Sequence, residues 1–392
     1  MVYFDHAATT PMLPEAVAAM TRELGEVGNA SSLHTSGRRA RRVVEESREA
    51  VAVAFGARPS EVVFTASGTE ADNLAVKGLF WSRRAADARR RRVVVSAIEH
   101  HALLEPVLWL AAHEGADVVE LAVDRVGRID PGALAAVLDD DDDVALVSVM
   151  WANNEIGTVQ PVSELAAIAA AHDVPFHTDA VQAAGQLHVD FAATAATAAT
   201  LSGHKFGGPP AVGVLLLGRS ATPVPVLHGG GQERDVRSGT LDVPGIAAMA
   251  AAALVVTADL PARQQHLAQI RDDLVTRVQQ VIPEAVLNGD PVLEPEHRLP
   301  GNAHFSFPGC EGDDLLMLLD AQGIECSTGS ACSAGVAQPS HVLLAVGADT
   351  DVARSSLRFS VGHTSTKADV DALVEALPGA VSRAREARGR AH

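Results

Sequence analysis

The sequence has only three cysteines, Cys310, Cys326 and Cys332, in 392 residues. An odd number of cysteines with no Cys-x-x-Cys pair excludes a disulfide framework and does not match the ligand spacing of a zinc site. We therefore expect reduced thiols, no metal site and a cytoplasmic protein.

Basic residues are also scarce relative to acidic ones. The chain has 31 Lys and Arg against 49 Asp and Glu, which gives a formal net charge of −18. Nucleic-acid binding draws its affinity from a basic surface, so this balance argues against a nucleic-acid partner. The local basic clusters at 38–42 and 89–92 are interpreted as a solvated helix face and a solvated loop.

Long apolar runs are absent too. The N-terminus has no basic segment followed by an apolar stretch, so we expect no secretory signal. The longest apolar stretch, around 245–256, is shorter than a membrane span. The sequence therefore predicts a protein that contacts no membrane.

What the chain does contain is an alternation of short β-branched runs with longer helical patterns. Its length is too great for one ordinary hydrophobic core, so two domains that share a cleft are expected. The alternation predicts an α/β protein with a mostly parallel central sheet and helices on both faces. The helical patterns cover 70–81, 101–113 and 162–172, and the strand-like runs are 62–65, 93–96, 144–149, 174–177, 199–202 and 212–217.

After Thr240 the pattern changes to a long helical region, broken at Pro261, that continues to about Ile282. Beyond it, three strand-like runs and two helical stretches predict a smaller α+β domain. The strands are expected at 304–307, 323–326 and 357–361, and the helices at 312–322 and 367–385.

Polar residues follow closely on five of the predicted strands. Ligands of parallel sheets bind at the carboxyl ends of the strands, so these residues should meet at one place. The five groups are Ser67-Gly68-Thr69, Glu99-His100, Asn153-Asn154, Asp179 with Gln182, and His204-Lys205.

Lys205 and Asp179 form the most informative pair of that set. A lysine at a strand-to-loop junction can form a Schiff base with an aldehyde, and a carboxylate one strand away can keep a pyridine nitrogen protonated. These two residues are the minimum set that a pyridoxal-phosphate enzyme needs to hold and activate its cofactor. Each residue taken alone has an ordinary alternative, since most lysines are on the surface and Asp179 is a chemically reasonable helix N-cap.

Taken together, the motifs resemble the cysteine desulfurases, the NifS/IscS-like branch of the class-V aminotransferases among pyridoxal-phosphate enzymes. The resemblance implies fold type I, pyridoxal 5'-phosphate as cofactor and a homodimer. It divides the chain into an N-terminal segment 1–14 near the active site, a large cofactor domain 15–258 and a small domain 259–392 with the cysteine loop. The motifs are Tyr3 to Pro11, Gly68 to Asn73, Asn153 to Gly157, Ser202 to Lys205, Arg237 to Thr240, Ser330 to Cys332 and Ser356 to Ser360.

The resemblance also implies a role for each site residue. Lys205 would hold the cofactor covalently, Asp179 would pair with its ring nitrogen, and His100 would stack on the ring and carry protons. Asn154 and Arg358 would hold the carboxylate of L-cysteine, for which an arginine fork is suited. The other cofactor contacts would be Gly68, Thr69, Gln182, Ser202, His204 and, from the neighbouring subunit, Thr240.

Cys332 separates this branch from plain aminotransferases. It lies in a run of small residues, 327–335, where its thiolate could attack the substrate sulfur and then pass that sulfur to an acceptor. The expected activity is conversion of L-cysteine to L-alanine with a persulfide left on Cys332. The sulfur would supply iron–sulfur cluster assembly, other thio-cofactors or tRNA thiolation through an acceptor protein.

Two other readings remain open at this point. A selenocysteine lyase or an aminotransferase-like enzyme could use the same fold and cofactor, since fold does not fix reaction. A protein of another class, a non-catalytic docking component of a sulfur-relay complex, could retain the cofactor as structure alone.

Overall fold

The computed structural model describes residues 1–140, 142–329 and 339–391. Its main feature is a seven-stranded sheet with the strand order β2-β8-β7-β6-β5-β3-β4. The strands are β2 (Val62–Thr65), β3 (Arg92–Ser96), β4 (Asp117–Leu121), β5 (Val144–Ser148), β6 (Phe176–Asp179), β7 (Ala198–Ser202) and β8 (Gly213–Leu217).

The sheet is mostly parallel, as predicted, and β8 is the exception. It runs antiparallel to both of its neighbours, β2 and β7. A connection too short for a crossover helix, residues 203–212, joins β7 to β8, and such a connection returns the chain in the opposite direction. Because this connection begins with Gly203–Lys205, Lys205 lies just past the carboxyl end of β7.

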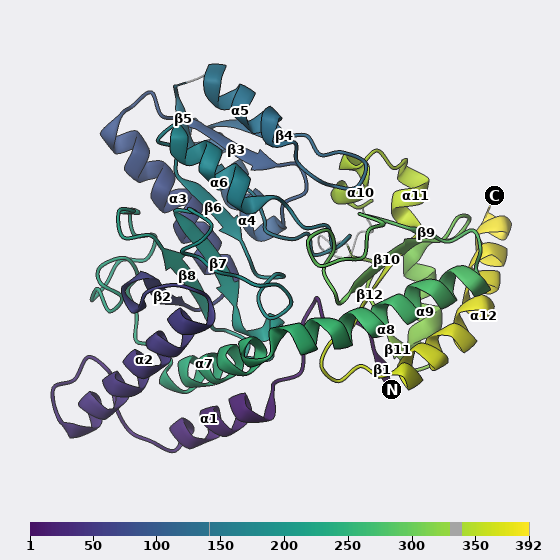
Figure 1. Ribbon diagram of the computed structural model, residues 1–392, viewed down its shortest axis with the longest axis horizontal. Coiled ribbons are helices and arrows are strands. Elements are labelled where there is room, and N and C mark those ends of the chain that lie inside the picture. The colour runs from purple at the N-terminus through teal and green to yellow at the C-terminus, as the bar shows by residue number, and fades with distance from the viewer. Residues whose placement is uncertain (141, 330–338, 392) are drawn as a thin grey trace.

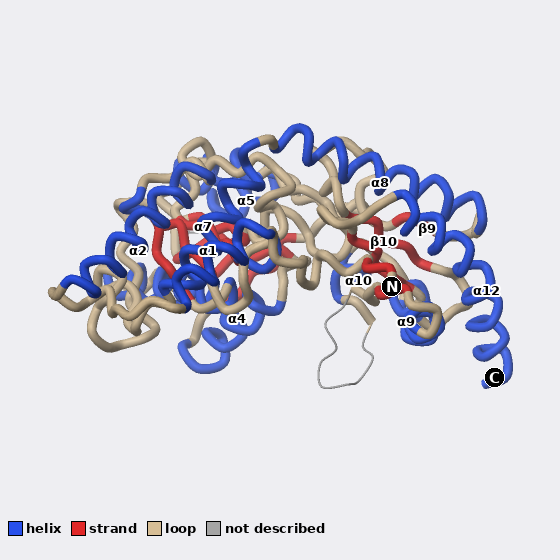
Figure 2. Tube along the Cα trace, turned by 90° about the horizontal axis from the view of Figure 1, so that it is seen from below, coloured by secondary structure: helices blue, strands red, loops and turns tan. Residues whose placement is uncertain are grey.

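Helices cover both faces of this sheet. Figure 2 shows α5 and α7 above the strands and α4 below them. One apolar core lies under α1, α2, α5, α6 and α7, and a second lies under α3 and α4. The bounds are α1 (Pro14–Leu24), α2 (Thr35–Ala54), α3 (Gly68–Ala86), α4 (His101–Glu114), α5 (Pro131–Asp140), α6 (Val162–Ala171) and α7 (Val243–Ala258).

Helix α8 (Leu260–Val281) leads from the large sheet to a smaller α+β unit (Figure 1). It is bent by 80° from α7, and Pro261 lies in its first turn, where no backbone N–H is required. The smaller unit has its own apolar core, formed by residues such as Leu274, Phe305 and Phe359. Its elements are β9 (Val286–Leu287), β10 (Asn302–Ser306), α9 (Gly312–Asp320), β11 (Ile324–Glu325), α10 (His341–Ala345), α11 (Thr350–Arg354), β12 (Ser356–Ser360) and α12 (Lys367–Ala391).

The N-terminal segment belongs to this smaller unit. Strand β1 (Val2–Tyr3) pairs in parallel with β11, and Asp5 bridges to Ser360 of β12. The side chain of Phe4 is buried in the same core. The chain therefore begins on the small unit and crosses to the large sheet before α1.

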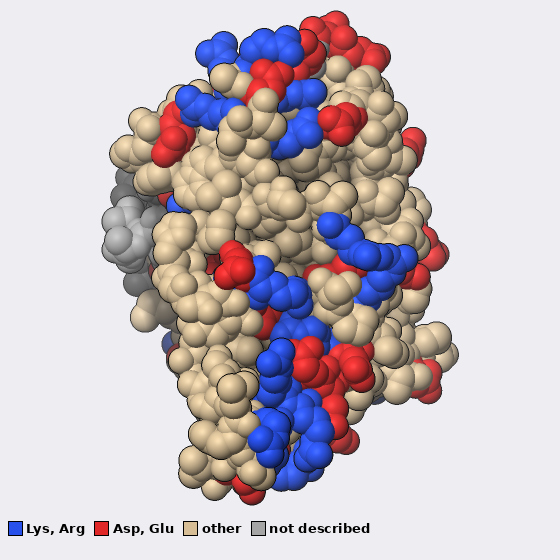
Figure 3. All heavy atoms as spheres, turned by 90° about the vertical axis from the view of Figure 1, so that its left-hand side faces the viewer, with Lys and Arg blue, Asp and Glu red and all other residues tan. Residues whose placement is uncertain are grey.

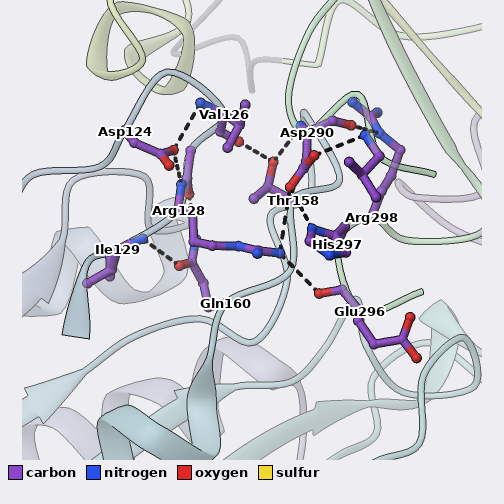
Figure 4. A network of polar contacts seen from close by, with 12 residues as sticks. Asp124, Val126, Arg128, Ile129, Thr158, Gln160, Asp290, Glu296, His297 and Arg298 are labelled. Atoms are coloured by element: carbon purple, nitrogen blue, oxygen red, sulfur yellow. Dashed lines mark hydrogen bonds and ion pairs between the residues drawn. The ribbon is translucent and has the colours of Figure 1, made fainter. Parts of the chain in front are cut away.

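A polar network joins the two units on the side of the loop that follows β5 (Figure 4). The Asp290 carboxylate accepts from the His297 ring at 3.0 Å and lies 3.7 Å from the Arg128 guanidinium. Thr158 accepts from the Asp290 backbone N–H at 3.3 Å and donates to the carbonyl of Val126. These contacts connect loops of the two units. They therefore hold the loop that follows β5 in position against the small unit.

The two basic clusters lie on the surface, as the sequence predicts. Arg38, Arg41 and Arg42 are exposed on α2, and Arg89 is paired with Asp87 at 2.8 Å. Figure 3 shows basic and acidic side chains interleaved on this face. Among the described residues, no single helix has the length and apolar character to cross a bilayer. Helices α7 and α8 reach that length and composition only when taken together, and they are bent by 80°.

Candidate active site

A cavity of about 270 Å³ lies at the carboxyl ends of β2, β3, β5, β6 and β7. The structure brings nine of the predicted site residues to its wall, which confirms that these strand ends meet at one place. They are Gly68, Thr69, His100, Asn154, Asp179, Gln182, Ser202, His204 and Lys205.

Lys205 lies in a short 3-10 helix, Gly203–Lys205, directly after β7. Its Nζ donates to the carbonyls of Ala7 and Ala8, at 2.7 and 2.8 Å, in the N-terminal segment. Burial, and to a lesser extent the nearby Arg358, lower the pKa of the Lys205 ammonium to about 8, while Asp179 and Asp5 oppose the shift. A lysine with a depressed pKa is a better nucleophile toward an aldehyde at neutral pH.

Asp179 is the last residue of β6, and its carboxylate reaches the same cavity. Its Oδ1 accepts from the backbone N–H of Val181 at 2.9 Å. Burial raises the pKa of this carboxyl to about 6, against the lowering effect of that N–H and of Lys205. A buried carboxylate in this position is stabilised by a cationic partner, and a protonated ring nitrogen would be such a partner.

A second carboxyl, Asp72 on α3, lies in the same wall and is 1% exposed. Burial first and Asp179 second raise its pKa well above the usual range. Its Oδ1 has no hydrogen-bond partner among the described residues, and His177 Nε2 lies 3.6 Å away. Two carboxyls sharing one buried space favour one neutral and one ionised group, and these pKa directions leave Asp179 as the ionised member.

The other end of the cavity has an anion-binding character. Helix α3 begins here, and its N-terminal amides face the site beside Ser202 and His204. The Ser67 hydroxyl caps the helix by accepting from the Glu70 N–H at 3.0 Å. A Cβ on Gly68 would lie 3.2 Å from the Cβ of Ser202, so a glycine keeps this end open.

His100 caps helix α4 and faces both this cavity and the next one. Its Nδ1 accepts from the Ala102 N–H at 3.1 Å, so the neutral ring carries its proton on Nε2. Burial, with smaller contributions from the neighbouring Lys205 and His101, lowers the pKa of His100 to about 4.

A second cavity of about 180 Å³ adjoins the first and shares four residues with it, His100, Asn154, Gln182 and Lys205. We call it the antechamber. Arg358 of β12 lies in its wall, with Nη1 donating to the Asn154 carbonyl at 2.9 Å.

The Arg358 guanidinium is held on another side by Asp5. Its Nη2 donates to Asp5 Oδ1 at 2.7 Å, whereas the buried Nε has no partner among the described residues. A buried guanidinium with a free N–H is suited to bind a carboxylate.

Comparisons with known proteins agree with this geometry. Residues 2–373 match the family model of aminotransferase class V. This chain belongs to the aminotransferase class-V family. It is 59% identical over 389 residues to the IscS-like cysteine desulfurase of Mycobacterium tuberculosis, covering 99% of this chain and 98% of that protein.

Two further relatives match nearly the whole of this chain. The cysteine desulfurase IscS of Dictyoglomus turgidum is 40% identical over 385 residues, which cover 98% of this chain and 95% of that protein. A solved NifS-like protein superposes with a TM-score of 0.89 at 33% identity, covering 97% of this chain and 99% of that one.

The class-V cavity fits pyridoxal 5'-phosphate. The ring nitrogen would lie against Asp179, the aldehyde carbon near Lys205, and the phosphate at the start of α3. The space in front of Gly68, which a Cβ would narrow, agrees with a phosphate at that end of the cavity.

Three described residues among the predictions, Thr240, Glu99 and Asn153, do not line the first cavity. Thr240 is exposed and does not line either cavity of its own chain. Glu99 and Asn153 follow strands but turn away from the first cavity: Glu99 Oε1 accepts from the Met150 N–H and Asn153 Nδ2 donates to the Ile98 carbonyl. Cys332 lies outside the described residues.

Sequence reasoning also missed residues that the structure places at the site. Asp5 and the carbonyls of Ala7 and Ala8 come from the N-terminal segment, and His341 comes from the small unit. The Asp5-His6-Ala7-Ala8 motif was the available signal, but nothing in its pattern shows that two backbone carbonyls contact the lysine.

Proposed function

We propose that this chain is a pyridoxal-phosphate-dependent cysteine desulfurase that converts L-cysteine to L-alanine and moves the sulfur to Cys332. The observation that carries this proposal is the pair of connected cavities. One is lined by Lys205 and Asp179, which suit the cofactor, and the other is lined by Arg358, whose guanidinium suits the substrate carboxylate. The relatives named as cysteine desulfurases favour this reaction over selenocysteine cleavage or simple transamination.

The cofactor would withdraw electrons from Cα of the bound amino acid. Lys205 would hold the cofactor in the resting enzyme and, once released by substrate, would find its ammonium bound by the Ala7 and Ala8 carbonyls. Asp179 would keep the ring nitrogen protonated. Arg358 would hold the substrate carboxylate in the antechamber, and so orient the side-chain sulfur away from that wall.

His100, which the low pKa keeps neutral at neutral pH, would take the proton of the substrate thiol on Nδ1, in place of the Ala102 N–H that this nitrogen accepts in the structure. The Cys332 thiolate would then attack the substrate sulfur. The new S–S bond forms as the Cβ–S bond breaks, and the carbon side takes a proton to become the methyl group of alanine.

Mass spectrometry after brief incubation with L-cysteine tests this assignment. The Cys332 peptide should gain one sulfur, and alanine should appear in equal amount. The Cys332→Ala variant should retain the bound cofactor and lose both signals, whereas Cys326→Ser and Cys310→Ser serve as controls and should retain them. Cofactor binding and a cysteine-dependent spectral change without any added sulfur would reject desulfuration.

We also propose a homodimer in which Thr240 of one subunit completes the phosphate site of the other. The exposure of Thr240, which lines neither cavity of its own chain, supports this. In a mixture of Lys205→Ala and Thr240→Asp chains, each defective alone, the mixed dimer has one site with both residues intact. Recovered activity supports the shared site, and no recovery from a verified mixed dimer contradicts it.

The acceptor is proposed to be a protein of iron–sulfur cluster assembly, reached in the cytoplasm. The net charge of −18 and the two described cysteines, both free, agree with a reducing compartment and a protein acceptor rather than a nucleic acid. Transfer of labelled sulfur from the persulfide to a purified scaffold protein would test the acceptor class.

A further inference from the structure

Three spaces follow one another from the surface to the cofactor cavity, and histidines stand at both boundaries. The outermost is an open hollow on α4, which we call the outer hollow. It shares His101 and His341 with the antechamber, and the antechamber shares His100 with the cofactor cavity. The lining of the outer hollow is Ala97, His101, Leu104, Glu105, Leu108, Glu120, Ala122, His341 and Ala345.

The three imidazole rings form a row. The ring centroids of His100 and His101 are 6.5 Å apart, and those of His101 and His341 are 5.3 Å apart. The first separation is too long for a direct hydrogen bond between ring nitrogens but has room for one bridging water. Proton transfer along such a row needs no movement of the backbone.

The hydrogen bonds leave transferable nitrogens on His341 and His101, whereas Nδ1 of His100 accepts from the Ala102 N–H and must give up that contact to take a proton. Among the described residues, His341 Nε2 lies 2.9 Å from the Glu99 carbonyl, which can only accept, so Nε2 carries a proton and Nδ1 is available. His101 Nδ1 lies 3.5 Å from the Glu105 carboxylate, and its side chain is 41% exposed. A positive charge on the His101 ring would therefore be hydrated and close to an anion.

His100 itself is poorly suited to keep a proton. Its ring is held at a pKa of about 4 by burial and by the surrounding cations, so a proton taken from a substrate thiol must leave quickly. The partly exposed ring of His101 is the neighbouring imidazole, and it also lines the outer hollow. The charged and titratable groups facing the row are Glu105 on α4, Glu120 on β4, Glu155 after β5, Lys205 after β7 and Arg358 on β12.

We propose that His101 and His341 pass protons between solvent in the outer hollow and His100. This role rests on the proposed desulfurase function. The proton released by the substrate thiol goes from His100 to the His101–His341 pair, and one proton returns by the same path when the methyl group of alanine forms. No net proton is gained or lost, and the two residues act through His100 rather than on the substrate.

Chemical rescue tests the relay in the cofactor-loaded enzyme. His101→Ala and His341→Gln should each slow alanine formation by at least about tenfold, because a positioned proton-transfer group contributes factors of this size or larger. Added imidazole, at constant pH and ionic strength, should restore the rate with saturation. The glutamine of His341→Gln can still donate to the Glu99 carbonyl, so this variant removes the transferable proton and leaves that contact.

The matched control is His113→Ala, which removes an exposed imidazole from the last turn of the same helix. Its rate, like that of the wild type, should not depend on imidazole. An unchanged rate in the His101 and His341 variants, or a lower rate that imidazole does not restore, would overturn the relay. A wild-type enzyme that forms no alanine would overturn the desulfurase function as well, which separates the two failures.

Discussion

The depressed pKa of Lys205 makes cofactor attachment depend on pH in a specific way. Only the neutral amine attacks an aldehyde, and lowering the pKa from 10.5 to about 8 raises its neutral fraction at pH 7 about 300-fold. The rate of attachment of pyridoxal 5'-phosphate to the cofactor-free enzyme should rise about tenfold per pH unit up to pH 8 and then level off. An ordinary exposed lysine would still be gaining rate at pH 10.

Two variants should move the midpoint of this curve of attachment rate against pH in opposite directions. Arg358→Met removes a cation that lowers the pKa of Lys205, so the midpoint should rise. Asp179→Asn removes an anion that raises it, so the midpoint should fall. Arg354→Met, which removes an exposed arginine two residues before β12, is the control and should leave the midpoint unchanged.

Stopped-flow absorbance of the forming cofactor band, recorded between pH 6 and pH 10.5, measures the midpoint directly. A midpoint near 10 would show that burial does not perturb the lysine. A midpoint near 8 that neither Arg358→Met nor Asp179→Asn changes would leave burial as the sole cause of the lowered pKa. It would reject the electrostatic contributions of Arg358 and Asp179. The same shift makes stability rise with pH between about 8 and 10.5, because there the unfolded lysine binds more protons than the folded one.

Three further predictions follow from single contacts. Glu233→Ala should lower the free energy of unfolding by about 3 to 5 kcal/mol in urea titrations, because it leaves the buried Arg48 with only the half-exposed Glu45 as an anionic partner; a loss below about 1 kcal/mol would contradict this. Asp5→Ala should raise KM for L-cysteine by roughly tenfold or more through loss of a charge-assisted bond to Arg358, while Asp5→Asn, which keeps an acceptor oxygen, should stay within about threefold; equal effects of the two would reject a positioning role. Iodoacetamide should label Cys326 only after unfolding, since burial raises its thiol pKa to about 12, and rapid labelling of the folded protein at pH 8 would show otherwise.

The central sheet could be predicted well from sequence because its buried strands are short, β-branched and separated by helical patterns. Every strand-like run named from the sequence of the large domain corresponds to a strand within a few residues. The strand that was missed, β4, is at the edge of the sheet and is only partly buried, so its pattern Asp117-Val118-Val119-Glu120-Leu121 lacks a continuous apolar run. Two-residue strands such as β9 carry no periodic signal at all.

The site divides in a similar way. Lys205, Asp179 and His100 follow directly on strands, so the direction of a parallel sheet is enough to bring them together. Asp5 and His341 depend on how the small unit packs against the large sheet, and local pattern does not contain that information. The oxygen atoms that hold Lys205 belong to the backbone of two alanines, and backbone contacts leave no trace in side-chain type.

The route of the N-terminal segment has a consequence for biosynthesis. Asp5 contacts Arg358 and Ala7 contacts Ser360, each pair separated by 353 residues. Contacts between such distant parts of a chain form late, because the intervening chain must first be ordered. On the ribosome, the first residues to emerge must therefore wait for β12, almost at the end of translation, before they find their partners. A nascent chain released before that point can contain the large sheet, but the N-terminal segment beside Lys205 is not yet held in place by β12.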